Sequence, residues 1–241
     1  MREIVLFNMG NEYECEEMEW MKEKATYNID LSALPGTNCY CDDIATEVIR
    51  DSISNVPLDA MHFFGSGNYH YLSYFWLERI PMDFVLVVFD HHPDAKADSI
   101  GGLLSCGNWV QYALEHCSHL QRVYYVGTNR ELYQECVEEG TADYGSKTRL
   151  GDTLSDMMRE NTFPVYLSID KDVLTEEDAR CDWNQGDLKL KELMTELAFM
   201  SEGRILGIDI CGEKKEKPFT CDLATNLRTN QKLISFLQQN N

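Results

Sequence analysis

The stretch Val85-Leu86-Val87-Val88-Phe89-Asp90-His91-His92-Pro93-Asp94 decides the fold of this chain. Its five leading apolar residues, three of them β-branched valines, predict a strand that is buried on both faces. Because side chains alternate along an extended chain, Asp90, His92 and Asp94 would all point to one side. Carboxylates and an imidazole that converge at the carboxyl end of a buried strand favour a divalent metal ion, and in open α/β sheets that end is where ligands bind.

The rest of the chain alternates between short apolar strands and helices. Strands are predicted at 4–8, 60–64, 84–89, 122–126, 165–169 and 204–210. Helices are predicted at 12–24, from 42 past 49, and at 70–79, 106–115, 131–139, 188–200 and 223–237, with Asp42 and Asp187 as N-caps of the second and sixth. Residues 140–163 remain unassigned. This alternation predicts an α/β fold with three α-β-α layers around a mostly parallel central sheet, and a single domain over residues 1–241.

Composition narrows the classes of partner. The 241 residues are 44% hydrophobic and 26% charged, as in globular proteins, and the net charge is −20. Nucleic acids and anionic membranes both attract basic surfaces, so neither is expected as a partner. The acidic balance is compatible with a small, cationic substrate. The nine cysteines have no paired C-x-x-C frame, and the first apolar run is too short for a signal peptide, so we expect a reduced, cytoplasmic setting.

Ligand-type side chains follow three of the predicted strands. Parallel strands release their carboxyl ends on the same side of a sheet, so these side chains can meet in one cleft. Four carboxylates and two imidazoles exceed what one zinc ion needs and fit two divalent ions that share bridging carboxylates. The set consists of His70, Asp90, His92, Asp94, Asp170 and Asp172.

Two adjacent metal ions indicate hydrolysis as the reaction of the site. They lower the pKa of a bridging water, which makes hydroxide available at neutral pH, and they polarise the carbon under attack. The oxygen-rich ligand set favours Mn²⁺ over Zn²⁺, although ligand type alone leaves Zn²⁺ and Fe²⁺ open. Taken singly, each motif has an ordinary structural explanation, such as a helix N-cap for Asp170 or a packed imidazole for His70.

Three motifs resemble those of the arginase/agmatinase (ureohydrolase) superfamily, which shares its fold with histone-deacetylase-type enzymes. Gly67-Asn68-Tyr69-His70 is similar to the family's Gly-Gly-Asp-His motif, Asp90–Asp94 to Asp-Ala-His-x-Asp, and Ser168–Asp172 to Ser-x-Asp-x-Asp. Their order and separation also match. The resemblance implies a small-molecule substrate and leaves a homo-oligomer open, since family members are often trimeric or hexameric. It implies that His70 and Asp94 hold one manganese ion, that His92 and Asp172 hold the other, and that Asp90 and Asp170 bridge them.

The chain also departs from the family pattern. Val110 stands where arginases carry a histidine that works in proton transfer, and Gly212 stands where they carry a glutamate that grips the guanidinium. Glu213, one residue further on, is the candidate replacement for that glutamate. His91 is a candidate proton shuttle, although alternation points it away from the metals and favours a packed imidazole. The candidate catalytic residues are therefore Asp90, Asp170, His91 and Glu213.

The leading hypothesis is a binuclear-metal hydrolase of a linear C–N bond in a guanidino, amidino or amide compound, acting through a metal-bridging hydroxide. An amide substrate would suit a deacetylase-like site in which Asp90, His92 and Asp172 surround one zinc ion. A second hypothesis is a manganese phosphoesterase of the DHH type, because Asp90-His91-His92 and, faintly, Ala97–Gly101 resemble its motifs. A third is a metal-binding protein of the same fold without catalytic activity, since the proton-transfer histidine is missing.

Overall fold

The computed structural model describes residues 1–96, 102–140, 142–200 and 205–239. Its centre is a sheet of eight strands in which every neighbouring pair is parallel. The strands lie in the order β2 (Tyr27–Asp30), β1 (Ile4–Asn8), β4 (Met61–Phe63), β10 (Ile205–Cys211), β9 (Val165–Asp170), β5 (Phe84–Phe89), β7 (Leu120–Val126) and β8 (Thr148–Gly151).

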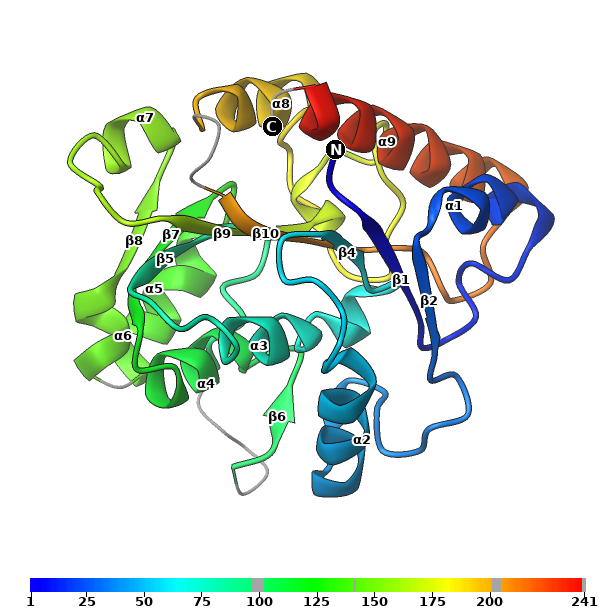
Figure 1. The fold of residues 1–241 in the computed structure, drawn as a ribbon. Coiled ribbons are helices and arrows are strands. Elements are labelled where there is room, and N and C mark those ends of the chain that lie inside the picture. The colour runs from blue at the N-terminus through cyan, green and yellow to red at the C-terminus, as the bar shows by residue number, and fades with distance from the viewer. Residues whose placement is uncertain (97–101, 141, 201–204, 240–241) are drawn as a thin grey trace.

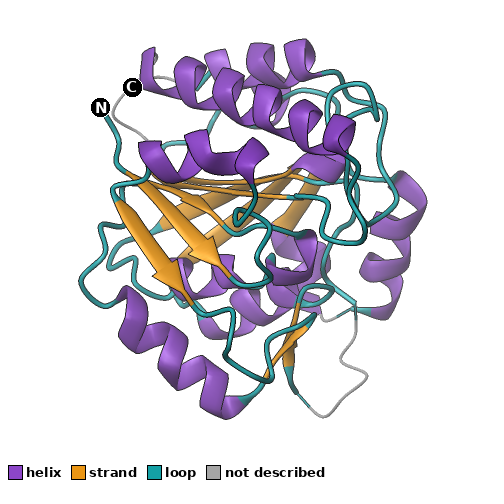
Figure 2. Ribbon diagram, turned by 90° about the vertical axis from the view of Figure 1, so that its right-hand side faces the viewer, coloured by secondary structure: helices purple, strands orange, loops and turns teal. Residues whose placement is uncertain are grey.

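Helices cover both faces of this sheet, so the molecule has three α-β-α layers (Figures 1 and 2). One layer contains α1 (Glu19–Lys24), which follows the 3-10 turn Glu16–Met18, together with α7 (Leu154–Met157), α8 (Leu190–Ala198) and α9 (Thr220–Gln239). The other contains α2 (Asp43–Ile53), α3 (Leu72–Leu77), α4 (Trp109–His116), α5 (Arg130–Glu139) and α6 (Ala142–Lys147). A small antiparallel pair, β3 (Tyr40–Cys41) and β6 (Leu104–Ser105), lies beside the second layer.

Strand β5 shows why an unbroken apolar run takes a central position. Val85, Val87 and Phe89 pack into the core under α8 and α9, whereas Leu86 and Val88 pack into the opposite core. All six residues of the strand are buried. Because side chains alternate between the faces, only a strand covered on both sides can bury such a run. The predicted α/β class and parallel sheet are therefore confirmed.

Local predictions were correct in part. Asp42 caps α2 as expected, accepting a hydrogen bond from the backbone N–H of Ala45 at 2.8 Å. Asp187 does not cap α8, because the chain stays extended to Leu188, which bridges Leu174, and the helix begins at Leu190. The long helix predicted at 12–24 is reduced to residues 16–24, and the unassigned region 140–163 forms α6, β8 and α7. The edge strand β2 was not predicted. Within the described residues, no helix has the length and apolar character needed to cross a membrane.

Candidate metal centre

Four adjacent strands, β4, β10, β9 and β5, bring the candidate ligands to one edge of the sheet. After β4 the chain turns at Gly65, whose φ of +76° suits glycine, and a 3-10 turn at Gly67–Tyr69 then carries His70 toward the ends of the neighbouring strands. Asp90 directly follows β5, and Asp170 ends β9. Parallel strands end on the same side, so residues that are far apart in the sequence meet there.

His70 lies at the bottom of the site against two carboxylates. Its Nδ1 is 3.1 Å from Asp90 Oδ2 and 3.0 Å from Asp94 Oδ2, and the side chain is completely buried. Nδ1 nevertheless makes no hydrogen bond within the described residues. The other ring nitrogen, Nε2, is 2.8 Å from Ser168 Oγ, a contact that fixes the ring orientation. The imidazole therefore presents Nδ1 to the carboxylates in the way a metal ligand does.

A second group shares Asp90 with the first. His92 Nδ1 is 2.9 Å from Asp172 Oδ2 and 3.6 Å from Asp90 Oδ1. Backbone N–H groups orient both carboxylates, since His92 donates to Asp90 Oδ1 at 2.6 Å and His91 donates to Asp172 Oδ1 at 3.0 Å. Asp90 presents one oxygen to each group, which is the placement that a bridging carboxylate requires.

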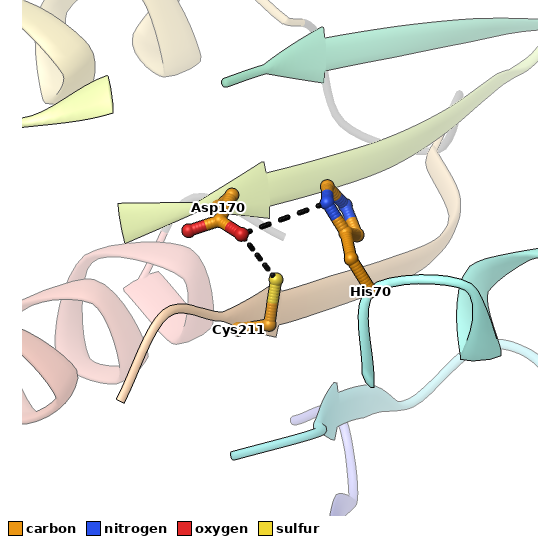
Figure 3. A group of neighbouring side chains, drawn as sticks. All are labelled: His70, Asp170 and Cys211. Carbon is orange, nitrogen blue, oxygen red and sulfur yellow. Dashed lines mark hydrogen bonds and ion pairs between the residues drawn. The ribbon is translucent and has the colours of Figure 1, made fainter. Parts of the chain in front are cut away.

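Asp170 lies between β9 and the 3-10 turn Lys171–Val173. Its Oδ1 accepts a hydrogen bond from the backbone N–H of Asp172 at 2.9 Å. Its Oδ2 faces His70, 3.6 Å from Nδ1, and also Cys211, 3.1 Å from Sγ (Figure 3). The structure thus brings the six predicted ligands together in overlapping groups.

The electrostatics of the bare side chains are unfavourable. Burial raises the pKa of Asp90, Asp94 and Asp170 above the usual carboxyl range, and neighbouring carboxylates raise it further. Burial and the charge of Asp90 raise the pKa of Asp172 to about 7. Burial opposes protonation of His92, but hydrogen bonds to Asp172 and Asp90 raise its pKa to about 11. Three buried carboxylates and the partly buried Asp94, gathered around two imidazoles, fit divalent cations well.

A cavity of about 300 Å³ opens onto these carboxylates. Its wall includes Trp183, whose indole N–H donates to Asn68 Oδ1 at 2.9 Å, and two thiols, Cys39 and Cys106, from the chain around β3 and β6. The volume suits a small ligand rather than a polymer. The loop containing Trp183 thus forms part of the cavity wall.

Two candidate catalytic residues lie outside this cavity. The side chain of His91 lines a different hollow, beside Gly186 and the chain after β7. Glu213 is 2% exposed and accepts hydrogen bonds at Oε1 from Lys171 Nζ (2.5 Å) and Asn230 Nδ2 (2.7 Å), while its Oε2 makes none within the described residues. Val110, at the position of the missing histidine, is buried in the core. The phosphoesterase-like segment Ala97–Gly101 lies outside the described residues.

Sequence reasoning missed Cys211. This residue pairs in register with Asp170 across β10 and β9, which directs its thiol to the same edge. The sequence Asp209-Ile210-Cys211 contains the thiol at the end of a predicted strand. Placing that thiol beside Asp170 requires the register of two strands that are distant in the sequence.

Comparison with known proteins supports the fold. No protein-family model matches the chain. An uncharacterised protein of Thermotoga maritima is 38% identical over 151 residues, which are 63% of this chain and only 57% of that relative's length.

Three solved structures resemble the chain over nearly its whole length. Formimidoylglutamase of Bacillus subtilis has a TM-score of 0.65 at 13% identity and covers 99% of this chain and 87% of its own. Arginase of Medicago truncatula has a TM-score of 0.64 at 17% identity and covers 98% of this chain and 85% of its own. A triple mutant of the T. brucei arginase-like protein bound with Mn²⁺ has a TM-score of 0.63 at 14% identity and covers 100% of this chain and 91% of its own. The resemblance to the arginase/ureohydrolase superfamily is therefore confirmed at the level of the fold.

Proposed function

We propose that this chain is a divergent member of the arginase/ureohydrolase superfamily, a single-domain enzyme that binds two divalent cations and hydrolyses a linear C–N bond of a small guanidino, amidino or amide compound. One observation carries the proposal: Asp90 offers one oxygen to each of two ligand groups, one with His70 and Asp94, the other with His92 and Asp172. Mn²⁺ is the favoured metal because oxygen donors predominate, and a triple mutant of an arginase-like structural relative is bound with Mn²⁺.

Each part of the site has a chemical task. Bound metals would lower the pKa of water and polarise the bond under attack. Asp90 and Asp170 would hold both metals, and the Ser168 contact keeps His70 oriented. Trp183 lines one side of the cavity and would cover one side of a bound substrate. The surplus of carboxylates favours a cationic or strongly dipolar substrate.

Glu213 receives less support as a substrate ligand than the sequence suggested. Its carboxylate bonds Lys171 and Asn230 and does not line the cavity. Of the described residues that line the cavity, only the metal-site aspartates carry a carboxylate, so these would recognise a guanidinium group. Amide and amidine substrates need no such partner, and we rank them equal to guanidines. We further propose a reducing, cytoplasmic setting, in agreement with nine free thiols.

The test is metal content per chain after purification without chelator and reconstitution with Mn²⁺. We expect two equivalents in the wild type and loss of at least one in Asp170→Asn. Asp209→Asn is the matched control, because Asp209 is an equally buried carboxylate of β10 that bonds Tyr166 and His62 instead. Circular dichroism must show that both variants are folded.

The outcomes separate the candidate functions. Two equivalents justify a screen of guanidino, amidino and then amide compounds for release of urea or amine. One equivalent of zinc would favour the deacetylase-like site of Asp90, His92 and Asp172, which form a group of their own. Two metals without turnover on any C–N compound would favour a non-catalytic metal protein. Absence of metal from the wild type would refute the proposal.

A further inference from the structure

A thiol lies at the metal centre where the ligand set otherwise contains only nitrogen and oxygen. Cys211 is the last residue of β10 and is 1% exposed. Its Sγ is 3.1 Å from Asp170 Oδ2. Figure 3 shows the side chains of Cys211, Asp170 and His70 converging from three separate segments of the chain.

The unpartnered imidazole nitrogen is an independent sign of a ligand at this point. His70 Nδ1 is fully buried and makes no hydrogen bond within the described residues. It lies with Cys211 Sγ and an Asp170 carboxylate oxygen in a set whose members are all within 4.8 Å of one another. Nδ1 also faces the carboxylates of Asp94 and Asp90 at 3.0 and 3.1 Å, so a cation placed here would give the imidazole the bond that it lacks and would balance the facing carboxylates.

Resting on the proposed binuclear site, we propose that Cys211 is a thiolate ligand of the metal held by His70, so that the two metal positions differ in chemistry. The first position has an imidazole, carboxylates and a sulfur. The second, around His92 and Asp172, has only an imidazole and carboxylates within the described residues. Cys211 gives its proton to solvent when the metal binds, because a coordinating thiol is deprotonated.

The difference in donors predicts a difference in metal selectivity. Soft thiolate ligands favour zinc and other borderline metals, whereas carboxylates suit Mn²⁺. We therefore infer a mixed centre in which the Cys211 position prefers Zn²⁺ or Co²⁺ and the other position accepts Mn²⁺. The neighbouring Gly212 supports the close approach, since a Cβ there would lie 2.5 Å from Asp170 Oδ1.

Cobalt reconstitution tests the sulfur ligand directly. Metal-free full-length protein is titrated with Co²⁺, and metal content and the near-ultraviolet thiolate-to-cobalt charge-transfer band are recorded for wild type and Cys211→Ser. Cys181→Ser is the matched control, because Cys181 is also buried nearby but its thiol bonds the backbone oxygen of Gly212 at 3.1 Å. The double variant Cys39→Ser/Cys106→Ser removes the other two thiols of the cavity wall.

We expect two cobalt ions in the wild type, with a band that is lost in Cys211→Ser and retained in both controls. X-ray absorption on zinc-loaded wild type supplies a readout that needs no variant, and a sulfur shell at about 2.3 Å is expected. Two bound metals without band or sulfur shell would overturn the thiolate ligand while leaving the binuclear site intact. A band lost only in the Cys39/Cys106 double variant would also overturn it. Failure to bind any cobalt or zinc would refute both proposals together.

Discussion

The buried ion pair between Lys171 and Glu213 provides a sharp test of what Glu213 does. Lys171 stands between the ligands Asp170 and Asp172, and both members of the pair are at most 2% exposed. Lys171 Nζ donates to Glu213 Oε1 at 2.5 Å and to Asn230 Oδ1 of α9 at 3.0 Å. If Glu213 serves this pair, Glu213→Gln leaves an uncompensated cation beside the metal centre and destabilises the fold.

The expected size follows from burial. Removing one member of a fully buried pair costs about 3–5 kcal/mol. An unfolding entropy of about 2.1 cal/mol/K per residue over 241 residues amounts to about 0.5 kcal/mol/K, so Tm should fall by about 6–10 °C. Lys171→Met/Glu213→Gln removes both charges and should recover much of that loss, because the penalty belongs to the charge left alone.

Thermal unfolding followed by calorimetry at constant pH, with and without Mn²⁺, measures this effect. Asp152→Asn is the control, since its ion pair with Arg130 has both side chains more than half exposed, and it should shift Tm by no more than about 2 °C. A shift in Glu213→Gln as small as the control, accompanied by a raised KM, would refute the reasoning and return Glu213 to the role of substrate ligand. A double variant that is less stable than Glu213→Gln would refute the ion-pair explanation.

Other perturbations probe the walls of the site. Ser168→Ala removes the oxygen 2.8 Å from the buried imidazole, so Mn²⁺ affinity measured by titration calorimetry should fall about 10- to 100-fold, and an unchanged affinity would contradict this role. Gly67→Ala places a Cβ 2.8 Å from a metal-site carboxylate oxygen and should weaken Mn²⁺ binding about tenfold. Gly107→Ala, in the same cavity wall, meets no atom within 4 Å and should leave Mn²⁺ binding unchanged; equal effects of the two variants would contradict the steric explanation. A hydrogen bond from Cys106 lowers the pKa of Cys39 to about 7, so the rate of Cys39 alkylation, followed by mass spectrometry, should be half-maximal near pH 7 and shift to higher pH in Cys106→Ala. An unperturbed midpoint near pH 8.5 in the wild type would contradict that hydrogen bond.

Much of the fold and site could be predicted because local patterns encode them. The apolar run of β5 requires burial on both faces. Asp90 and Asp94 do meet at His70, but the predicted alternation is not the reason, because β5 ends at Phe89 and Asp94 has a φ of +47°. The carboxyl-end rule of parallel sheets then adds His70 and Asp170 without knowledge of strand order.

The missed features depend on contacts between distant segments. The thiol of Cys211 reaches the site only through the register of β10 with β9, which no local pattern reveals. Glu213 accepts a hydrogen bond from Asn230 on α9, a contact that no local pattern reveals, and its role as a substrate ligand stays a prediction. Strand β2 is an edge strand with only partly buried side chains, so the propensity signal over Tyr27–Asp30 is weak.

The position of β10 in the sheet has a consequence for how the protein assembles. Among the described strands, β10 comes last in the sequence, and in the hydrogen-bonded order of the sheet it lies between the group β2, β1 and β4 and the group β9, β5, β7 and β8. The facing edges of β4 and β9 therefore stay without backbone partners until β10 inserts between them. Pairing of strands that are distant in the sequence is slow. Because His70 belongs to one group and Asp90 to the other, the metal centre forms across this junction. Bound metal would thus stabilise the product of a late folding step. A chain synthesised without metal would expose the unpaired strand edges for longer and be more prone to aggregate.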